Sequence, residues 1–136
     1  MNHSHSNIWT HLVLWTKGHQ RVISYDMNQS IKDALDLVLV ENSDQQLHCS
    51  ILQDHIHLLI KLPGNISVDR LVGLLQVHIC EKLEQSGFRP CIEWDEHYHA
   101  HSVSLNRLSA EKNLLERQEY KHKDISLFEE LKFLGM

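Results

Sequence analysis

Hydrophobic and polar residues alternate along the chain with two different periods, and these periods divide it into predicted strands and helices. Apolar, β-branched-rich runs predict strands at 8–17, 47–53 and 55–62 and a fourth beginning at Cys91. Apolar positions at helical spacing predict helices at 31–39, from Ser67 to Gly87, from Ser109 through Gln118, and a short last helix at 127–134. Ser67 and Ser109 are the expected N-caps of the second and third of these helices. The order of these elements predicts an α+β fold, a ferredoxin-like split βαβ antiparallel sheet with helices on one face and extra C-terminal helices.

This topology makes the first and third strands central in the sheet. The helix after the fourth strand must cross back over the sheet or along its edge, so it can bring side chains to a face of the third strand. The chain has 136 residues and neither internal repeats nor a Pro/Gly/Ser-rich linker. We therefore expect a single domain over 1–136, with residues 1–7 disordered.

The third predicted strand carries two histidines separated by one residue, His55 and His57. Side chains alternate between the faces of a strand, so these two imidazoles point the same way. Two imidazoles on one face of a rigid strand form half of a metal site. The alternative is a chance pair of partly buried core histidines, because the chain holds twelve histidines.

A second alternating set, His97, His99 and His101, follows the start of the fourth predicted strand. In an extended segment these side chains also share one face. They are compatible with a zinc site, formed alone or with Glu93 or Asp95, but the sequence favours a solvated histidine-rich edge.

Charge does not mark the chain as a dedicated nucleic-acid binder, because its formal net charge is −5 and its pI is near 6.1. Two basic stretches stand out against this balance. The first contains Lys17, His19 and Arg21; the second contains Lys112, Arg117, Lys121, His122 and Lys123. Each is compatible with an ordinary solvated face or with contacts to a polyanion.

The three cysteines, Cys49, Cys80 and Cys91, are odd in number and show no C-x-x-C spacing. This pattern predicts free thiols and a cytoplasmic protein. No stretch approaches the length of a membrane span, so we expect no membrane association.

Several motifs in order along the chain resemble the HUH single-tyrosine transposases of insertion sequences and their relatives, the REP-associated tyrosine transposases. The matching segments are Thr10-His11-Leu12-Val13-Leu14 with Lys17, Asp54-His55-Ile56-His57-Leu58-Leu59-Ile60, Ile66-Ser67-Val68, the set Trp94, Tyr98 and Ser102, and the tail Gln118-Glu119, His122-Lys123 and Leu127-Phe128-Glu129-Glu130. The resemblance covers nearly the whole chain.

The resemblance implies cleavage and transfer of a DNA strand through a phosphotyrosine bond, as in DNA transposition and recombination. It implies a divalent metal, Mg²⁺ or Mn²⁺, held by His55, His57 and Gln118. It also implies single-stranded or hairpin DNA as the partner and a homodimer as the assembly. The residues expected to contact DNA are Lys17, His19, Arg21, Arg117, Lys121 and Lys123.

The position expected to hold the nucleophile, four residues before Gln118, is Leu114. A leucine has no oxygen and cannot form a phosphotyrosine bond, so we expect this position to be inactive and the family reaction to be impaired. Tyr98 and Tyr120 are the alternative nucleophiles, but neither occupies the matching position.

Two other functions stay open. The chain can be a non-catalytic, domesticated DNA-binding regulator, or a metal-dependent phosphodiesterase that uses water. A histidine-triad nucleotide hydrolase is disfavoured, because the next alternate position after His57 is Leu59.

Overall fold

The computed structural model describes residues 8–42 and 47–116. Its elements in chain order are β1 (Trp9–Thr16), the 3₁₀ turns η1 (Lys17–His19) and η2 (Tyr25–Met27), α1 (Asn28–Asn42), β2 (Leu47–Ile51), β3 (His55–Lys61), α2 (Val68–Gln85), β4 (Trp94–Val103), the 3₁₀ turn η3 (Leu105–Arg107) and α3 (Leu108–Glu116). None of the helices in these two ranges is both long and apolar enough to cross a membrane.

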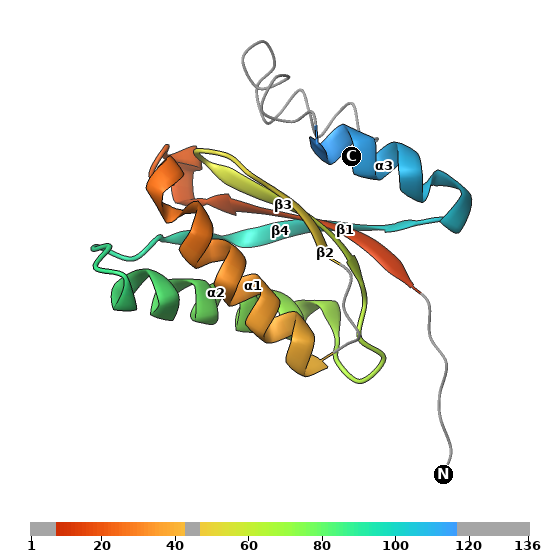
Figure 1. The fold of residues 1–136 in the computed structure, drawn as a ribbon, viewed down its shortest axis with the longest axis horizontal. Coiled ribbons are helices and arrows are strands. Elements are labelled where there is room, and N and C mark those ends of the chain that lie inside the picture. Colours follow the sequence, from red (N-terminus) through yellow and green to blue (C-terminus); the bar gives the residue numbers. More distant parts are fainter. Residues whose placement is uncertain (1–7, 43–46, 117–136) are drawn as a thin grey trace.

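The four strands form one antiparallel sheet in the order β2-β3-β1-β4. The first and third strands are therefore central, as the sequence predicts. Helices α1 and α2 cover one face of this sheet, and α3 lies over the other (Figure 1). The predicted α+β fold is confirmed, with the helix after β4 returning across the sheet.

The face under α1 and α2 holds the main hydrophobic core. Alternate residues of the central strands, including Leu12, Leu14, Ile56 and Leu58, are fully buried there. They pack against apolar residues spaced by three or four along the two helices, namely Ile31, Ala34, Leu35, Leu71, Leu75, Ile79 and Leu83. This face therefore carries most of the burial that stabilises the fold.

The face under α3 combines a small apolar cluster with polar side chains. Trp9, Leu59 and Val103 come from three strands and pack with Leu115 of α3. This contact fixes α3 over the part of the sheet where β3, β1 and β4 run side by side.

Local chemistry explains where two of the helices begin. Ser67 caps α2 as predicted, because its hydroxyl accepts a hydrogen bond from the Arg70 backbone N–H at 3.1 Å. Ser109 was expected to cap the third helix, but α3 begins at Leu108. The turn η3 runs directly into the helix, so Ser109 lies inside its first turn. The short helix predicted at 127–134 lies outside the described residues.

The fourth strand starts at Trp94 and not at the predicted Cys91. The pairing of β4 with β1 is irregular at this end, with a register shift between Leu14 and Thr16. Cys91 is instead held against α2 by a disulfide to Cys80, with the two Cα atoms 5.5 Å apart. The segment before Trp94 is therefore tied to α2 at Cys91 and meets the end of β1 only at Glu93, whose carbonyl accepts a hydrogen bond from the Lys17 backbone N–H at 2.9 Å.

The same disulfide corrects the prediction of three free thiols. Only Cys49 is free among the cysteines. The sequence does not suggest the pairing, because the two partners are 11 residues apart and meet only after the chain reverses beyond α2. The reversal occurs at Gly87, whose φ of 88° favours glycine. The cytoplasmic location, which relied partly on free thiols, stays a prediction.

Candidate functional site

The sheet face under α3 gathers histidines from all three of the neighbouring strands β1, β3 and β4. We call it the histidine face and define it by His11, His55, His57, His99 and His101. Strand alternation puts these residues on the side opposite the main core. His11, His55 and His57 are fully buried, whereas His99 and His101 are half-buried.

His55 and His57 lie next to each other, with their ring centroids 4.9 Å apart. The Nδ1–H of His55 donates a hydrogen bond to Asp54 Oδ1 at 2.6 Å. With that proton on Nδ1, the lone pair of a neutral His55 ring is on Nε2. Aspartate thus orients this imidazole in the way that carboxylates orient metal-binding histidines.

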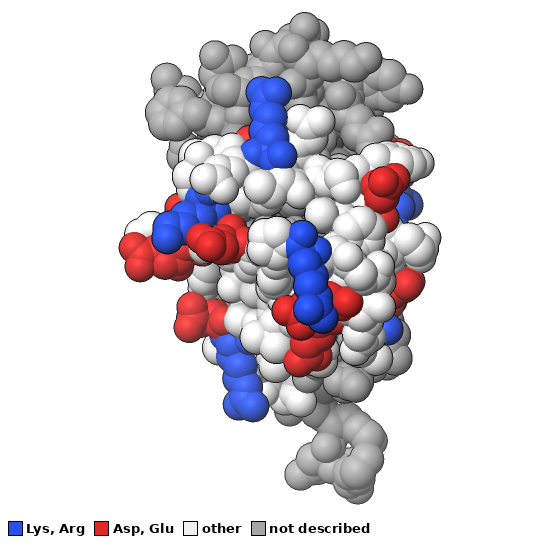
Figure 2. Space-filling model, turned by 90° about the vertical axis from the view of Figure 1, so that its left-hand side faces the viewer, with Lys and Arg blue, Asp and Glu red and all other residues white. Residues whose placement is uncertain are grey.

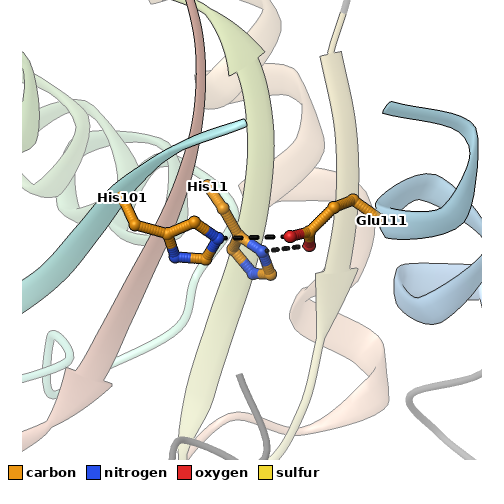
Figure 3. Close-up of side chains that lie close together, drawn as sticks. All are labelled: His11, His101 and Glu111. Carbon is orange, nitrogen blue, oxygen red and sulfur yellow. Dashed lines mark hydrogen bonds and ion pairs between the residues drawn. The ribbon is translucent and has the colours of Figure 1, made fainter. Parts of the chain in front are cut away.

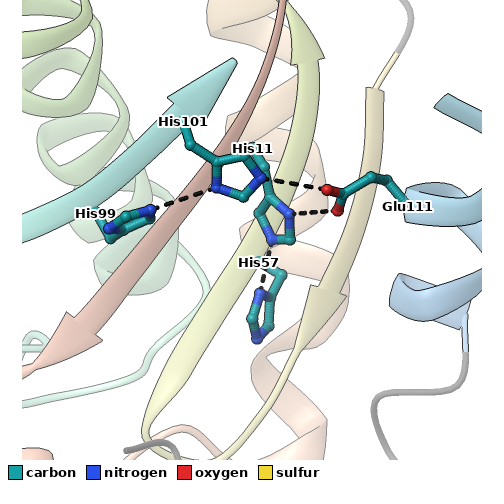
Figure 4. A network of polar contacts seen from close by, with 5 residues as sticks. All are labelled: His11, His57, His99, His101 and Glu111. Carbon is teal, nitrogen blue, oxygen red and sulfur yellow. Dashed lines mark hydrogen bonds and ion pairs between the residues drawn. The ribbon is translucent and has the colours of Figure 1, made fainter. Parts of the chain in front are cut away.

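His11 joins the pair from the neighbouring strand. Its Nδ1–H donates to Glu111 Oε2 at 3.0 Å, and its Nε2 is 2.9 Å from His57 Nδ1. A carboxylate can only accept, so the proton of a neutral His11 ring is on Nδ1 and its Nε2 accepts from the Nδ1–H of His57. The chain of contacts from Glu111 through His11 therefore leaves the lone pair of His57 on Nε2 (Figure 4).

Glu111 reaches the histidine face from the first half of α3, and only a small part of it is exposed. Its second oxygen, Oε1, accepts a hydrogen bond from His101 Nε2–H at 3.2 Å. The hydrogen bond from His11, with that from His101, outweighs burial and lowers the pKa of the Glu111 carboxyl to about 2. Glu111 is therefore an ionised carboxylate held between two imidazoles (Figure 3).

The alternating histidines of β4 do not act as one set. His97 is exposed and lies near Glu96, whereas His99 Nε2 contacts His101 Nδ1 at 3.3 Å. Burial, with smaller contributions from His101 and His11, lowers the pKa of His99. The suggested partners Glu93 and Asp95 contact other groups: Glu93 pairs with Lys17, and Asp95 accepts from the His97 backbone. The carboxylate that His101 contacts is that of Glu111.

Sequence reasoning missed Glu111 and gave His11 no role of its own. The available signal for His11 was strand alternation, which places it on the same face as Trp9 and Val13 in a central strand. The signal for Glu111 was its position three residues before Leu114 on one helical face. Neither signal alone indicates that the two side chains meet.

Leu114 is half-buried in α3, three residues after Glu111 and beside the buried Leu115. The helix therefore presents the Glu111 side toward the histidine face, with Leu114 one turn further along. Gln118, the predicted third metal ligand, lies outside the described residues. So do Arg117, Lys121 and Lys123.

The first predicted DNA-contacting group lies where β1 ends. Lys17 and His19 form part of η1, and both are exposed, as is Arg21. Lys17 Nζ is 3.9 Å from Glu93, and both side chains are largely exposed. Figure 2 views the molecule from this end and shows Lys and Arg interspersed with Asp and Glu, without a single basic patch. Electrostatic attraction to a polyanion would therefore be local.

Several solved structures share this fold, including the following two. One is a transposase-like protein from Deinococcus radiodurans, with a TM-score of 0.61 and 18% identity over 87% of this chain and 98% of the other. The second is a REP-associated tyrosine transposase bound to a REP hairpin, with a TM-score of 0.64 and 14% identity over 92% of this chain and 76% of the other. No curated protein sequence matches the chain.

The family model of the IS200-like transposases matches residues 4–118. This span includes all the described strands and helices, both histidines of the His55/His57 pair, and the position of Gln118. The chain therefore belongs to the IS200-like transposase family.

Proposed function

We propose that this protein binds single-stranded or hairpin DNA at a divalent-metal site formed by His55, His57 and Gln118, and that it has lost covalent strand transfer. The observation that carries the proposal is the buried His55/His57 pair, in which Asp54 and His11 orient the two rings. Family membership supplies the reaction class, and the hairpin carried by the REP-associated transposase suggests the kind of DNA.

The residues present fit a metal. Each histidine of the pair has Nδ1 engaged, so Nε2 is the unprotonated nitrogen that a metal requires. Hydrogen bonds to the opposite ring nitrogen are typical of metal-binding histidines. An amide oxygen from Gln118 would complete a set of two nitrogens and one oxygen, which suits Mn²⁺ and is compatible with Mg²⁺.

Each group has a distinct role in this proposal. When bound, the divalent cation would polarise a phosphate oxygen of the DNA backbone. His55 and His57 would hold it on the rigid centre of the sheet, while Asp54 and His11 keep the rings in position. Lys17, His19 and Arg21 would contact neighbouring phosphates at the end of β1. Assembly as a homodimer is part of the proposal, by analogy with the family.

Leu114 is the reason to expect impaired chemistry. In-line attack on a phosphate needs an oxygen nucleophile, and leucine offers none. Its place on α3, one turn beyond Glu111, is compatible with a former nucleophile position facing the DNA. Metal and DNA binding would persist without it.

The experiment that tests this proposal places a tyrosine hydroxyl at position 114. Leu114→Tyr protein, incubated with Mn²⁺ and a hairpin-bearing single strand, is expected to form a covalent DNA adduct visible on a denaturing gel. Asn113→Tyr is the matched control, since Asn113 is exposed on the same helix and should give no adduct. Adding His57→Ala to Leu114→Tyr should abolish the adduct.

Two outcomes would contradict the proposal. The first is failure of Leu114→Tyr to form an adduct although it binds the DNA, which would mean that no latent site exists. The second is an adduct formed by the wild-type protein and mapped by mass spectrometry to Tyr98 or Tyr120, which would mean that the reaction is not lost.

A further inference from the structure

The cluster of His11, His101 and Glu111 lies beside the His55/His57 pair but uses different residues. Its ligand atoms, one from each residue, all lie within 4.8 Å of one another. The three side chains come from β1, β4 and α3, so the fold and not a local motif brings them together (Figure 3). His11 is fully buried, Glu111 nearly so, and His101 half-buried.

The donor spacing is close to that of a tetrahedral metal centre. His11 Nδ1 is 3.0 Å from Glu111 Oε2, and His101 Nε2 is 3.2 Å from Glu111 Oε1. Donor atoms bound to one tetrahedral zinc ion at about 2.0–2.1 Å lie about 3.3–3.4 Å apart. The two histidine–carboxylate distances are therefore close to those of a zinc centre, and the two histidine nitrogens would have to lie at a similar separation, within the 4.8 Å that bounds the cluster.

Both histidines also have their opposite ring nitrogen engaged. His11 Nε2 contacts His57 Nδ1 at 2.9 Å, and His101 Nδ1 contacts His99 Nε2 at 3.3 Å (Figure 4). A metal-binding imidazole needs such a partner, because its remaining proton sits on the nitrogen that does not bind the metal. His57 and His99 are in place to accept those protons.

We propose that His11 Nδ1, His101 Nε2 and the Glu111 carboxylate form a second divalent-metal site, of the zinc class. Two imidazole nitrogens and one carboxylate oxygen favour zinc over magnesium. The Glu111 carboxylate is almost fully buried, and a divalent cation would offset the cost of burying its negative charge. The His101 side chain is 26% exposed, so solvent reaches this side of the cluster.

Because His11 contacts His57, metal binding at the second site should oppose metal binding at the His55/His57 site. A metal on His11 Nδ1 moves the ring proton to Nε2, which then donates to His57 Nδ1. His57 in turn carries its proton on Nε2, the nitrogen required by the site of the proposed function. Zinc at the second site should therefore weaken Mn²⁺ binding at His55/His57; this consequence, unlike the site itself, rests on the proposed function.

Calorimetric titration of metal-free protein with Zn²⁺ tests the site, with Co²⁺ absorption as a second readout. Glu111→Gln and His101→Phe are each expected to weaken Zn²⁺ binding by more than about 100-fold, and His99→Ala by about 10- to 100-fold. His55→Ala and the exposed His97→Ala should retain it. Circular dichroism checks that every variant is folded.

Each alternative pattern overturns the proposal. Loss of Zn²⁺ in His55→Ala with retention in Glu111→Gln assigns the ion to the first site. Equal Zn²⁺ binding by all variants indicates adventitious binding to other histidines. Nitrogen-15 NMR of the imidazole rings gives an independent check, because Zn²⁺ should move the His11 proton from Nδ1 to Nε2. A His11 ring that keeps its Nδ1 proton with Zn²⁺ bound also overturns it. Failure of Mn²⁺ binding alone counts against the proposed function only.

Discussion

His11 is the residue that connects the parts of the histidine face. It contacts the carboxylate of Glu111 through one ring nitrogen and His57 through the other. The protonation of one nitrogen fixes the role of the second, so the carboxylate on α3 determines which nitrogen of a neutral His57 ring carries the lone pair. A residue that does not belong to the His55/His57 pair thus sets its chemistry.

At the scale of single residues, we predict that Glu111 contributes to the free energy of unfolding and that this contribution is lost at acidic pH. Its pKa in the folded protein is about 2, below the ordinary value of 4.5. The folded state therefore gains stability above about pH 4.5 and loses it as the pH falls toward 2, by up to about 3 kcal/mol. In urea unfolding with a chelator present, Glu111→Gln should show a smaller loss of stability between pH 5 and pH 3 than wild type.

Glu116→Gln is the matched control, because Glu116 is exposed on the same helix. It should keep the wild-type pH dependence. Parallel curves for wild type and Glu111→Gln would show that the histidine contacts do not stabilise the carboxylate.

At the scale of elements, α3 is held to the sheet by few residues. Leu115 packs with Trp9, Leu59 and Val103, and Glu111 adds hydrogen bonds to two histidines. Helices in proteins owe most of their stability to packing of one face, so these contacts keep the described part of α3, Leu108–Glu116, docked on the sheet.

We predict that Leu115→Ala undocks α3 while the rest of the fold persists. The lost burial should cost about 2–4 kcal/mol, and amide hydrogen exchange in α3 should accelerate at least tenfold. Exchange in α2 should change little, because α2 lies on the opposite face. Asn113→Ala, at an exposed position of α3, should leave exchange unchanged. Equal acceleration in α2 and α3 would mean that the sheet and α3 unfold together.

Some features of the strands and helices could be predicted from the sequence, and others could not. Apolar periodicity and the Ser67 cap are local signals, and they predicted the strands, α2 and the central place of β1 and β3. The burial of Glu111 depends on His11, 100 residues away in sequence. Helical periodicity predicts which side of a helix is buried but not which residues it packs against. A charged residue on a helix is usually solvent-exposed, so the sequence does not predict that Glu111 is buried. The Cys80–Cys91 pairing was missed for a similar reason.

At the scale of the whole molecule, the formal net charge of −5 opposes binding to a polyanion. Any DNA affinity must then come from a few local cations. The surface pair between Lys17 and Glu93 is weak, because both side chains are largely exposed, so a phosphate can replace the carboxylate.

We therefore predict a shallow salt dependence for single-stranded DNA binding. Lys17→Ala should weaken binding and reduce the slope of log affinity against log salt by about 0.7, the value for one phosphate contact on a single strand. Lys32→Ala, exposed on α1 behind the sheet, should change neither quantity. Fluorescence anisotropy at several salt concentrations measures both. An unchanged slope in Lys17→Ala would remove this lysine from the interface.

The two faces of the sheet carry different sets of side chains, and this difference affects which substitutions the protein can tolerate during evolution. The side chains of the main core pack against α1 and α2, whereas the histidines lie on the opposite face of the sheet, where Glu111 of α3 contacts His11 and His101. Substitutions under α3 therefore leave the main core of the fold in place. A protein that is not under selection for strand transfer can lose a hydroxyl there and gain new histidines. Natural selection can then act on a new activity while the fold is still intact.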